Sequence, residues 1–222
     1  MPNSWCNDDL LAFFTAASVA QKDFAPQPAD AAYCFAHTQS NESPILHAAL
    51  DLWTTAKTSI ISLHGEEPAD QVGGNFVGYS GFTVWRDWLV ERGVPEGAIR
   101  RQQRLALPGQ VSHSGTEAKQ FVLDAKKEGW QTLFTVCHPS HALRGFTNVV
   151  THVVKMKLQI RVYSMPGPAQ PWYEDALGSQ GIETKTRIKA FGDELDRLNR
   201  IYNNEYDLIS CQRLLEYLEW RG

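Results

Sequence analysis

The sequence predicts an α/β fold, in which helices flank a mostly parallel sheet. Three observations lead to this prediction. Short apolar or β-rich runs alternate with amphipathic helical segments between residues 30 and 165. The spacing of these runs suits right-handed crossover connections between parallel strands. From Ile182 onward the pattern changes to two helices and no strand.

Each element has its own signal in the sequence. Apolar residues at helical spacing before Pro26 predict a short N-terminal helix. The run at 31–36 is apolar without alternation, as in a strand covered on both faces, and a polar loop is expected at 37–41. Ser43 and Pro44 supply a capping hydroxyl and a first-turn proline for the next helix. The other expected strands are at 59–63, within 98–107, at 132–137 and at 160–164, and the other helices begin near residues 82, 114 and 140.

The chain divides into three parts. Residues 1–29 are expected to form an N-terminal helical segment, residues 30–170 the α/β domain and residues 171–222 a C-terminal extension. We expect this extension to be a helical hairpin that packs on the same domain. A glycine-rich loop at 66–81 is too long for a simple connection, and loops of that kind often cover binding sites.

Composition and charge exclude several classes of protein. The chain has 222 residues with 21 basic and 25 acidic side chains, a net charge of -4, and no basic block that could neutralise phosphates, so a nucleic-acid partner is not expected. No apolar run approaches the roughly 20 residues that span a bilayer. The four cysteines are far apart, which matches neither a disulfide framework nor a zinc motif. We therefore expect a cytoplasmic protein with reduced thiols and no membrane partner.

Histidines follow several of the expected strands. Ligands of open parallel sheets bind beyond the carboxyl ends of the strands, near the point where the strand order reverses. His37 follows the first strand and His64 the second. His138 and His141 follow a later strand, and His113 precedes the next-to-last helix of the domain. We predict that these segments face one crevice.

Three interpretations of the histidines stay open. They could bind a metal ion such as zinc, act as general acid and base near neutral pH, or cap strand carbonyls. The sequence contains no metal-binding motif such as H-E-x-x-H, so we predict a polar organic ligand and no metal.

The segment at 112–118 offers a second candidate region. Ser114 and Glu117 have the S-x-x-E spacing of a helix capping box, which explains both residues without a ligand. The same helix N-terminus suits a phosphate or a carboxylate, and Ser112 and Thr116 add hydroxyl groups.

The segment after the strand at 132–137 offers a third. His141 and Arg144 lie one helical turn apart, and Arg144 either grips an anionic group or forms a salt bridge on the helix surface. Cys137 is expected in the core, because adjacent strand residues point to opposite faces and it cannot pair with His138 as nucleophile and base. The glycines at 73–81 match neither the dinucleotide fingerprint nor the P-loop.

Three motifs give the chain a family resemblance. Gly93-Val94-Pro95 with Ile99 looks like a G-V-P-x-x-x-I turn, Ser112 to Ala118 is similar to S-x-N-T-x-E-N, and His141-x-x-Arg144 is similar to H-x-x-R. In these motifs and in the order of its elements, the chain resembles the YdcF-like branch of the SanA/ElyC/YdcF family over roughly residues 30–165. The resemblance implies a Rossmann-like three-layer sandwich and binding of S-adenosylmethionine. It also implies envelope-related roles for the membrane-anchored branches.

We predict a small-molecule binding protein whose ligand is nucleotide-like, with S-adenosylmethionine as the ligand that the resemblance implies. The alternative is a transferase or hydrolase acting on a phosphorylated or glycosyl substrate, with Glu117 and His141 as catalytic residues. A third hypothesis is an interaction module whose C-terminal helices dock on a protein partner. The predicted ligand-binding residues are His37, His64, Gly65, Ser112, Ser114, Thr116, His138 and Arg144.

Overall fold

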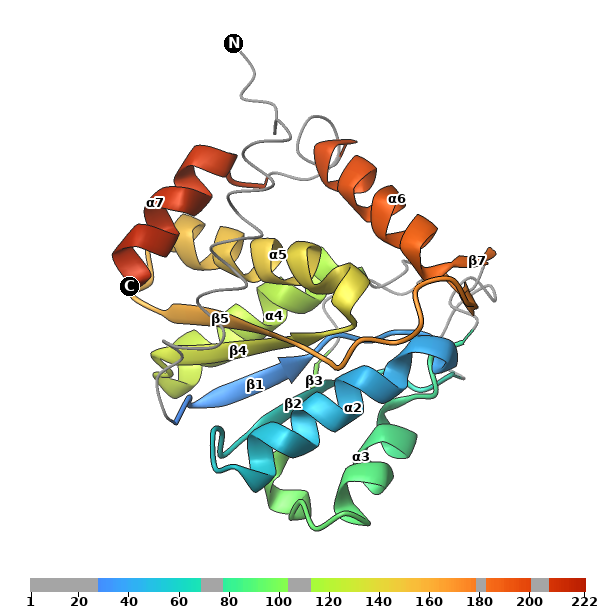
Figure 1. Ribbon diagram of the computed structural model, residues 1–222. Helices are drawn as coiled ribbons and strands as arrows, with labels where there is room; N and C mark the ends of the chain where they lie inside the picture. The colour runs from blue at the N-terminus through green and yellow to red at the C-terminus, as the bar shows by residue number, and fades with distance from the viewer. Residues whose placement is uncertain (1–27, 69–77, 104–112, 179–182, 201–207) are drawn as a thin grey trace.

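The fold is an α/β sandwich built on one parallel sheet. The computed structural model describes residues 28–68, 78–103, 113–178, 183–200 and 208–222. The five strands of the sheet follow the order β3-β2-β1-β4-β5, and every pair is parallel. They are β1 (Ala31–Cys34), β2 (Ile61–His64), β3 (Ile99–Gln102), β4 (Thr132–Cys137) and β5 (Arg161–Pro166). The predicted Rossmann-like fold is confirmed (Figure 1).

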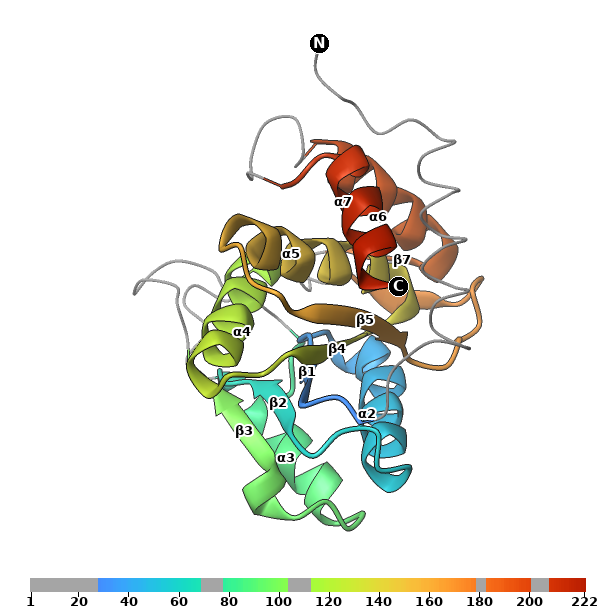
Figure 2. The same ribbon diagram turned by 90° about the vertical axis from the view of Figure 1, so that its left-hand side faces the viewer.

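Helices cover both faces of the sheet. α2 (Gln39–Thr54) and α3 (Phe82–Val90) lie on one face, and α4 (Ser114–Glu128) and α5 (Ala142–Lys155) lie on the other (Figure 2). A short 3-10 helix, η3 (Glu96–Ala98), precedes β3, and another, η4 (Pro139–His141), joins β4 to α5. The chain adds β2 and β3 on one side of β1, then β4 and β5 on the other. The strand order therefore reverses between β1 and β4, where ligands of such folds bind.

The central strand is buried on both faces, as the unbroken apolar run predicts. Ala31, Tyr33 and Phe35 pack into the core beneath α4 and α5. Ala32 and Cys34 pack into the second core, beneath α2 and α3. This alternation decides which side chains at the strand end reach which helix.

One glycine sets the distance between α5 and the sheet. A Cβ atom at Gly145 would lie 2.5 Å from Cys137 Sγ and 3.3 Å from the ring of Phe35. Only glycine fits this close approach without displacing neighbours. The thiols of Cys34 and Cys137 are free and buried, as expected for core positions.

The start of α2 differs from the prediction. The helix begins at Gln39 rather than after Ser43, so part of the expected polar loop is helical and Pro44 lies inside the helix. Proline has no amide hydrogen, and it therefore leaves the carbonyl of Ser40 without its usual helical donor. The Nη2 atom of Arg187 donates to that carbonyl at 3.1 Å. A distant residue thus replaces the missing helical hydrogen bond.

The C-terminal extension also differs, because it contains strands. β6 (Asp175–Leu177) pairs antiparallel with β7 (Thr184–Thr186), so the prediction of no strand after Ile182 was wrong. Strands of three residues are too short to show a periodic pattern. Two helices follow as expected, α6 (Arg187–Arg200) and α7 (Cys211–Arg221). They dock at separate places, α6 against η4 and β7, and α7 against α5.

Two expectations concern parts of the chain that the structure leaves out. The predicted N-terminal helix lies outside the described residues, as does 69–77 of the glycine-rich loop. Among the described helices, none is both long and apolar enough to cross a membrane.

Candidate functional site

Three histidines meet where the strand order reverses. His37 follows β1, and its ring centroid lies 5.3 Å from that of His138 and 6.1 Å from that of His141. All three side chains are buried. The ends of two neighbouring parallel strands and the short helix η4, which ends at His141, thus bring chain-distant imidazoles together, as the positions after the strands predict.

Burial keeps two of these imidazoles neutral near pH 7. Burial lowers the pKa of His37 well below its ordinary value, and the charges of His138 and Arg144 lower it further. Burial also lowers the pKa of His138 to about 4. The Nδ1 atom of His37 accepts the amide hydrogen of Thr38 at 2.9 Å, and that of His138 accepts the amide of Ser140 at 3.2 Å. Both rings therefore cap local backbone through Nδ1, and the Nε2 atom of His138 donates to the side-chain oxygen of Gln170 at 3.3 Å.

A second group forms around Glu117, in the first turn of α4. Tyr33 donates its hydroxyl hydrogen to Glu117 Oε2 at 2.8 Å, and the amide of Ala36 donates at 3.3 Å. His64 Nδ1 lies 3.8 Å from the same oxygen. Burial and the neighbouring Glu117 carboxylate raise the pKa of Tyr33, which keeps its hydroxyl protonated. The structure thus brings predicted residues from β2 and α4 together at the end of β1.

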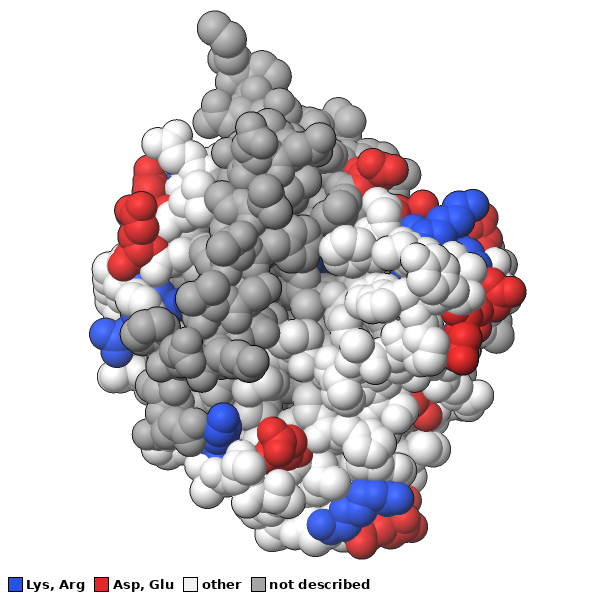
Figure 3. All heavy atoms as spheres, viewed as in Figure 1, with Lys and Arg blue, Asp and Glu red and all other residues white. Residues whose placement is uncertain are grey.

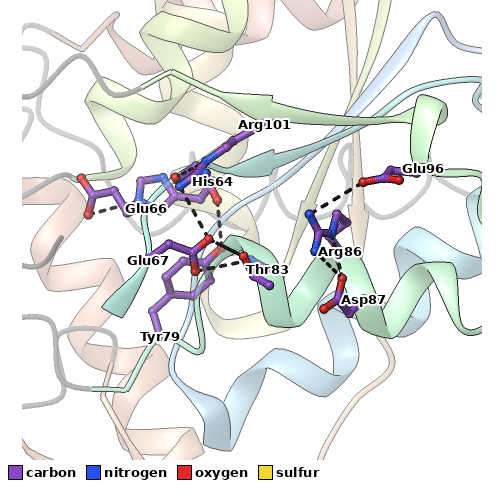
Figure 4. Close-up of polar contacts among 10 residues, drawn as sticks. His64, Glu66, Glu67, Tyr79, Thr83, Arg86, Asp87, Glu96 and Arg101 are labelled. Atoms are coloured by element: carbon purple, nitrogen blue, oxygen red, sulfur yellow. Dashed lines mark hydrogen bonds and ion pairs between the residues drawn. The ribbon is translucent and has the colours of Figure 1, made fainter. Parts of the chain in front are cut away.

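The surroundings of His64 fix its position (Figure 4). Its Nε2 atom lies 3.5 Å from Glu66 Oε2, so the imidazole stands between two carboxylates. Its backbone carbonyl accepts the hydroxyl hydrogen of Tyr79 at 3.0 Å. A Cβ atom at Gly65 would lie 2.0 Å from the carbonyl oxygen of Gln102. This close approach gives Gly65, a predicted ligand-binding residue, a structural reason that involves no ligand.

The predicted capping box is wrong. Ser114 is the first residue of α4, so it cannot act as the residue that caps the helix from outside. The N-cap residue is His113, and Thr116 has the place in the capping box that was predicted for Glu117. The Oγ1 atom of Thr116 accepts the amide hydrogen of His113 at 3.1 Å and donates to the His113 carbonyl at 2.7 Å. Glu117 is turned towards β1, and Ser112 lies outside the described residues.

Arg144 is buried against a residue that sequence reasoning missed. Its Nε and Nη2 atoms donate to the two carboxylate oxygens of Glu194 in α6, at 2.5 and 3.2 Å. Its Nη1 atom donates to Ser114 Oγ at 2.6 Å, and Asn148 donates to the same oxygen at 3.2 Å. Arg144 is 8% exposed, so the pair is not the helix-surface salt bridge considered above.

Residues of β6 and α6 in the C-terminal extension line a crevice together with the residues that follow β1 and β4. We call β6 and α6 the roof. Arg187 of α6 donates to Asn41 Oδ1 at 3.1 Å, besides its bond to α2 described above. The Leu177 carbonyl of β6 accepts hydrogen bonds from Thr38 Oγ1 at 2.9 Å and Asn41 Nδ2 at 3.1 Å. The cavity that remains has a volume of about 30 Å³. This volume holds about one or two waters.

One signal for the missed residues was present in the sequence. Arg187 and Glu194 are seven residues apart, and that spacing puts them on one face of a helix. Nothing local indicates which surface that face covers.

The two residues predicted as catalytic belong to different groups. Glu117 contacts Tyr33 and lies near His64, whereas His141 packs against Phe35 and His37. Within the described part of the chain, no three His, Cys, Asp or Glu side chains gather as they would around a metal ion.

Comparison of the chain with protein-family models, with curated proteins and with solved structures found no match.

Proposed function

We propose that this protein binds a small, nucleotide-like ligand beneath the roof, at the carboxyl edge of the sheet. One observation carries the proposal. At the point where ligands of this fold bind, the buried guanidinium of Arg144 already holds a carboxylate, which the chain supplies through Glu194. A guanidinium with a hydroxyl beside it, here Ser114, is a common recognition site for a ligand's carboxylate or phosphate.

The other side chains supply complementary chemistry. The carboxylate of Glu117 accepts hydrogen bonds at the end of β1, and a carboxylate is the group with which dinucleotide-binding folds accept the hydroxyl hydrogens of ribose. The neutral rings of His37 and His138 suit the uncharged part of such a ligand, because burial and neighbouring positive charge, from Arg144 for His37 and from Arg187 for His138, disfavour their protonation. S-adenosylmethionine, which the family resemblance implies, has both a ribose and a carboxylate.

Binding requires the roof to move. The cavity of about 30 Å³ is far smaller than the roughly 300 Å³ of the smallest ordinary ligand sites. Since a buried guanidinium is costly without a partner, the anionic group of the ligand would replace Glu194 on Arg144 as α6 moves away. We therefore expect ligand affinity to be limited by the contacts that hold the roof closed.

Calorimetric titration tests this proposal. S-adenosylmethionine, ATP and a nucleotide sugar are titrated into the wild-type protein, Glu194→Gln and the exposed-surface control Arg100→Gln. We expect at least one ligand to bind saturably, with higher affinity for Glu194→Gln and unchanged affinity for the control, because Arg100 pairs with Glu128 on the protein surface. Absence of binding to both the wild type and Glu194→Gln overturns the proposal and favours the interaction module, whose crevice is filled by its own side chains.

A second candidate, a transferase or hydrolase, is favoured by the position of His64 between Glu66 and Glu117. An imidazole between two carboxylates can accept and release a proton during turnover. Phosphoesters and nucleotide sugars are the substrates to screen, with Glu117→Gln and His141→Ala as variants. Turnover that both variants retain would remove these residues from the proposed mechanism.

A further inference from the structure

In the described part of the chain, the outer edge of β5 is covered by side chains of a helix rather than by another strand. β5 is the last strand on its side of the sheet (Figure 1). The amide of Arg161 donates to the carbonyl of Gln131, just before β4, at 2.8 Å. Successive residues of a strand direct their backbone groups to alternate sides, so those of Ile160 and Val162 point away from β4. These outward groups need partners of their own.

Two residues of α7 supply these partners. The hydroxyl of Tyr217 donates to the carbonyl of Ile160 at 2.9 Å and accepts the amide hydrogen of Val162 at 2.7 Å. The Nη1 atom of Arg221 donates to the carbonyl of Val162 at 2.9 Å. Tyr217 and Arg221 are four residues apart, which puts them on the same face of the helix. One face of α7 thus replaces hydrogen bonds that a neighbouring strand would make.

The rest of α7 fits a helix that covers the sheet from outside. Leu214 and Leu218 pack into the same core as Tyr217. Glu216 and Glu219 are exposed, and acidic side chains lie over α7 at the left of Figure 3. The apolar face of the helix and its contacts with the strand therefore point the same way. Among the described elements, α7 is the one that closes the β5 edge.

The Arg221 contact is incomplete. Arg221 is buried, and its Cζ atom lies 4.5 Å from the centroid of the Tyr163 ring. Its Nε atom is buried and has no hydrogen-bond partner among the described residues. A buried donor on a charged group costs free energy when it is left without an acceptor. Water would supply that acceptor if the end of α7 moved away, so this part of the cover is closed at a cost.

We propose that the β5 edge is a surface on which a second copy of this chain pairs, and that α7 keeps this surface closed in the single chain. Antiparallel pairing about a two-fold axis at Val162 would put the two Val162 residues opposite each other, where they exchange both N–H···O bonds. Those are the groups that Tyr217 and Arg221 now satisfy. In this register Arg161 of each copy lies opposite Tyr163 of the other, so like charges do not face each other.

This inference goes beyond the function proposed above and does not depend on it. The described residues that line the crevice beneath the roof include none from α7 or β5. Loss of ligand binding and loss of strand pairing are therefore separate results.

Analytical ultracentrifugation of the full-length Tyr217→Phe/Arg221→Met variant tests the proposal. The variant leaves the outward groups of the strand without their partners, so α7 holds the edge less firmly. We expect its dimerisation constant to exceed that of the wild type by at least about tenfold. Tyr173→Phe/Arg213→Met is the matched control, because it makes the same two chemical changes at exposed positions. The control should associate no more than the wild type.

Hydrogen exchange at the Val162 amide identifies the surface. In dilute solution this amide should exchange roughly tenfold faster in the double variant than in the wild type, because Tyr217 no longer accepts its hydrogen. It should become protected again as the dimer forms. A double variant that associates no more than the wild type overturns the proposal, as does a dimer in which the Val162 amide still exchanges fast.

A milder variant decides the question if the double variant does not fold. Arg221→Met frees the Val162 carbonyl and keeps both hydrogen bonds of Tyr217. It should form a weaker dimer than the double variant, still above the wild type. Association equal to that of the wild type would overturn the proposal here too.

Discussion

The crevice beneath the roof and the hollow between α4 and α5, which we call the groove, differ in the burial of their basic side chains. In the crevice, Arg144 is buried and its charge is balanced by Glu194 from the same chain. In the groove, Lys119 and Lys155 are exposed and the described lining provides no carboxylate. One hollow measures about 30 Å³ and the other about 390 Å³.

This difference decides what the removal of a charge does in each place. In the crevice the anionic group of a ligand must replace the carboxylate of Glu194 on Arg144, so ligand binding competes with a contact of the folded chain. In the groove, the charges of Lys155 and Lys119 lie close enough to His152 to lower the pKa of its imidazole. Removing a charge should therefore destabilise the protein in the crevice, and should not do so in the groove.

The largest effect is expected for Arg144→Met. This change leaves the carboxylate of Glu194 buried without its guanidinium, which costs about 3–5 kcal/mol of the free energy of unfolding. Urea unfolding at pH 7 measures the loss.

The double variant Arg144→Met/Glu194→Leu is the control for this prediction. It removes both charges from the crevice, and it should recover most of the stability because no buried charge remains unpaired. A double variant as unstable as Arg144→Met would mean that the crevice depends on the shape of Arg144 rather than on balanced charge.

A smaller effect is expected on acidification. The pKa of His138 is about 4 in the folded protein, against an ordinary value of 6.5, so the unfolded chain binds more protons between these values. Stability is therefore complete above pH 6.5 and falls by about 3 kcal/mol as the pH decreases to 4, through this group alone.

Replacing the imidazole sharpens this pH prediction. His138→Gln should flatten the dependence of the free energy of unfolding on pH between 6.5 and 4. His47→Gln should not, because His47 is exposed. Equal slopes in the wild type and His138→Gln would show that other groups cause the acid sensitivity.

Tyr33→Phe tests the buried carboxylate of Glu117, in the group beside the crevice. The variant removes the hydroxyl that donates to Glu117 at 2.8 Å, and a hydrogen bond to a charged group contributes about 2 kcal/mol. Urea unfolding should show a loss of that size. Tyr173→Phe is the control, since that side chain is 86% exposed, and an equal loss in both variants would contradict the role of the hydroxyl.

The sheet was predictable because its signals are local. The unbroken apolar run at β1 reports burial on both faces, and the positions of His37 and His138 after their strands follow from the parallel order. The parallel order of β1 and β4 is enough to predict that these two histidines lie close together at one edge of the sheet. The start of α2 was missed because Ser43 and Pro44 mimic a helix start, whereas a bond from Arg187 allows the proline inside the helix.

The roof was not predictable in the same way. β6 and β7 have three residues each and show no period. The partners of Arg144 and of the Leu177 carbonyl are distant in the chain, at Glu194 and at Thr38, and no pattern in the sequence links them. Sequence reasoning therefore located the edge of the sheet but not the segment that covers it.

The smallest effect belongs to the groove. Without an added anion, Lys119→Gln should raise the free energy of unfolding by about 0.3 kcal/mol, because it relieves repulsion between like charges at a partly solvated surface. The same variant should raise the pKa of His152, which the charge of Lys119 lowers. Urea unfolding and an NMR titration of His152 measure the two changes. A loss of stability with an unchanged His152 pKa would mean that Lys119 does not act on the groove, and the contrast between the two hollows would then fail.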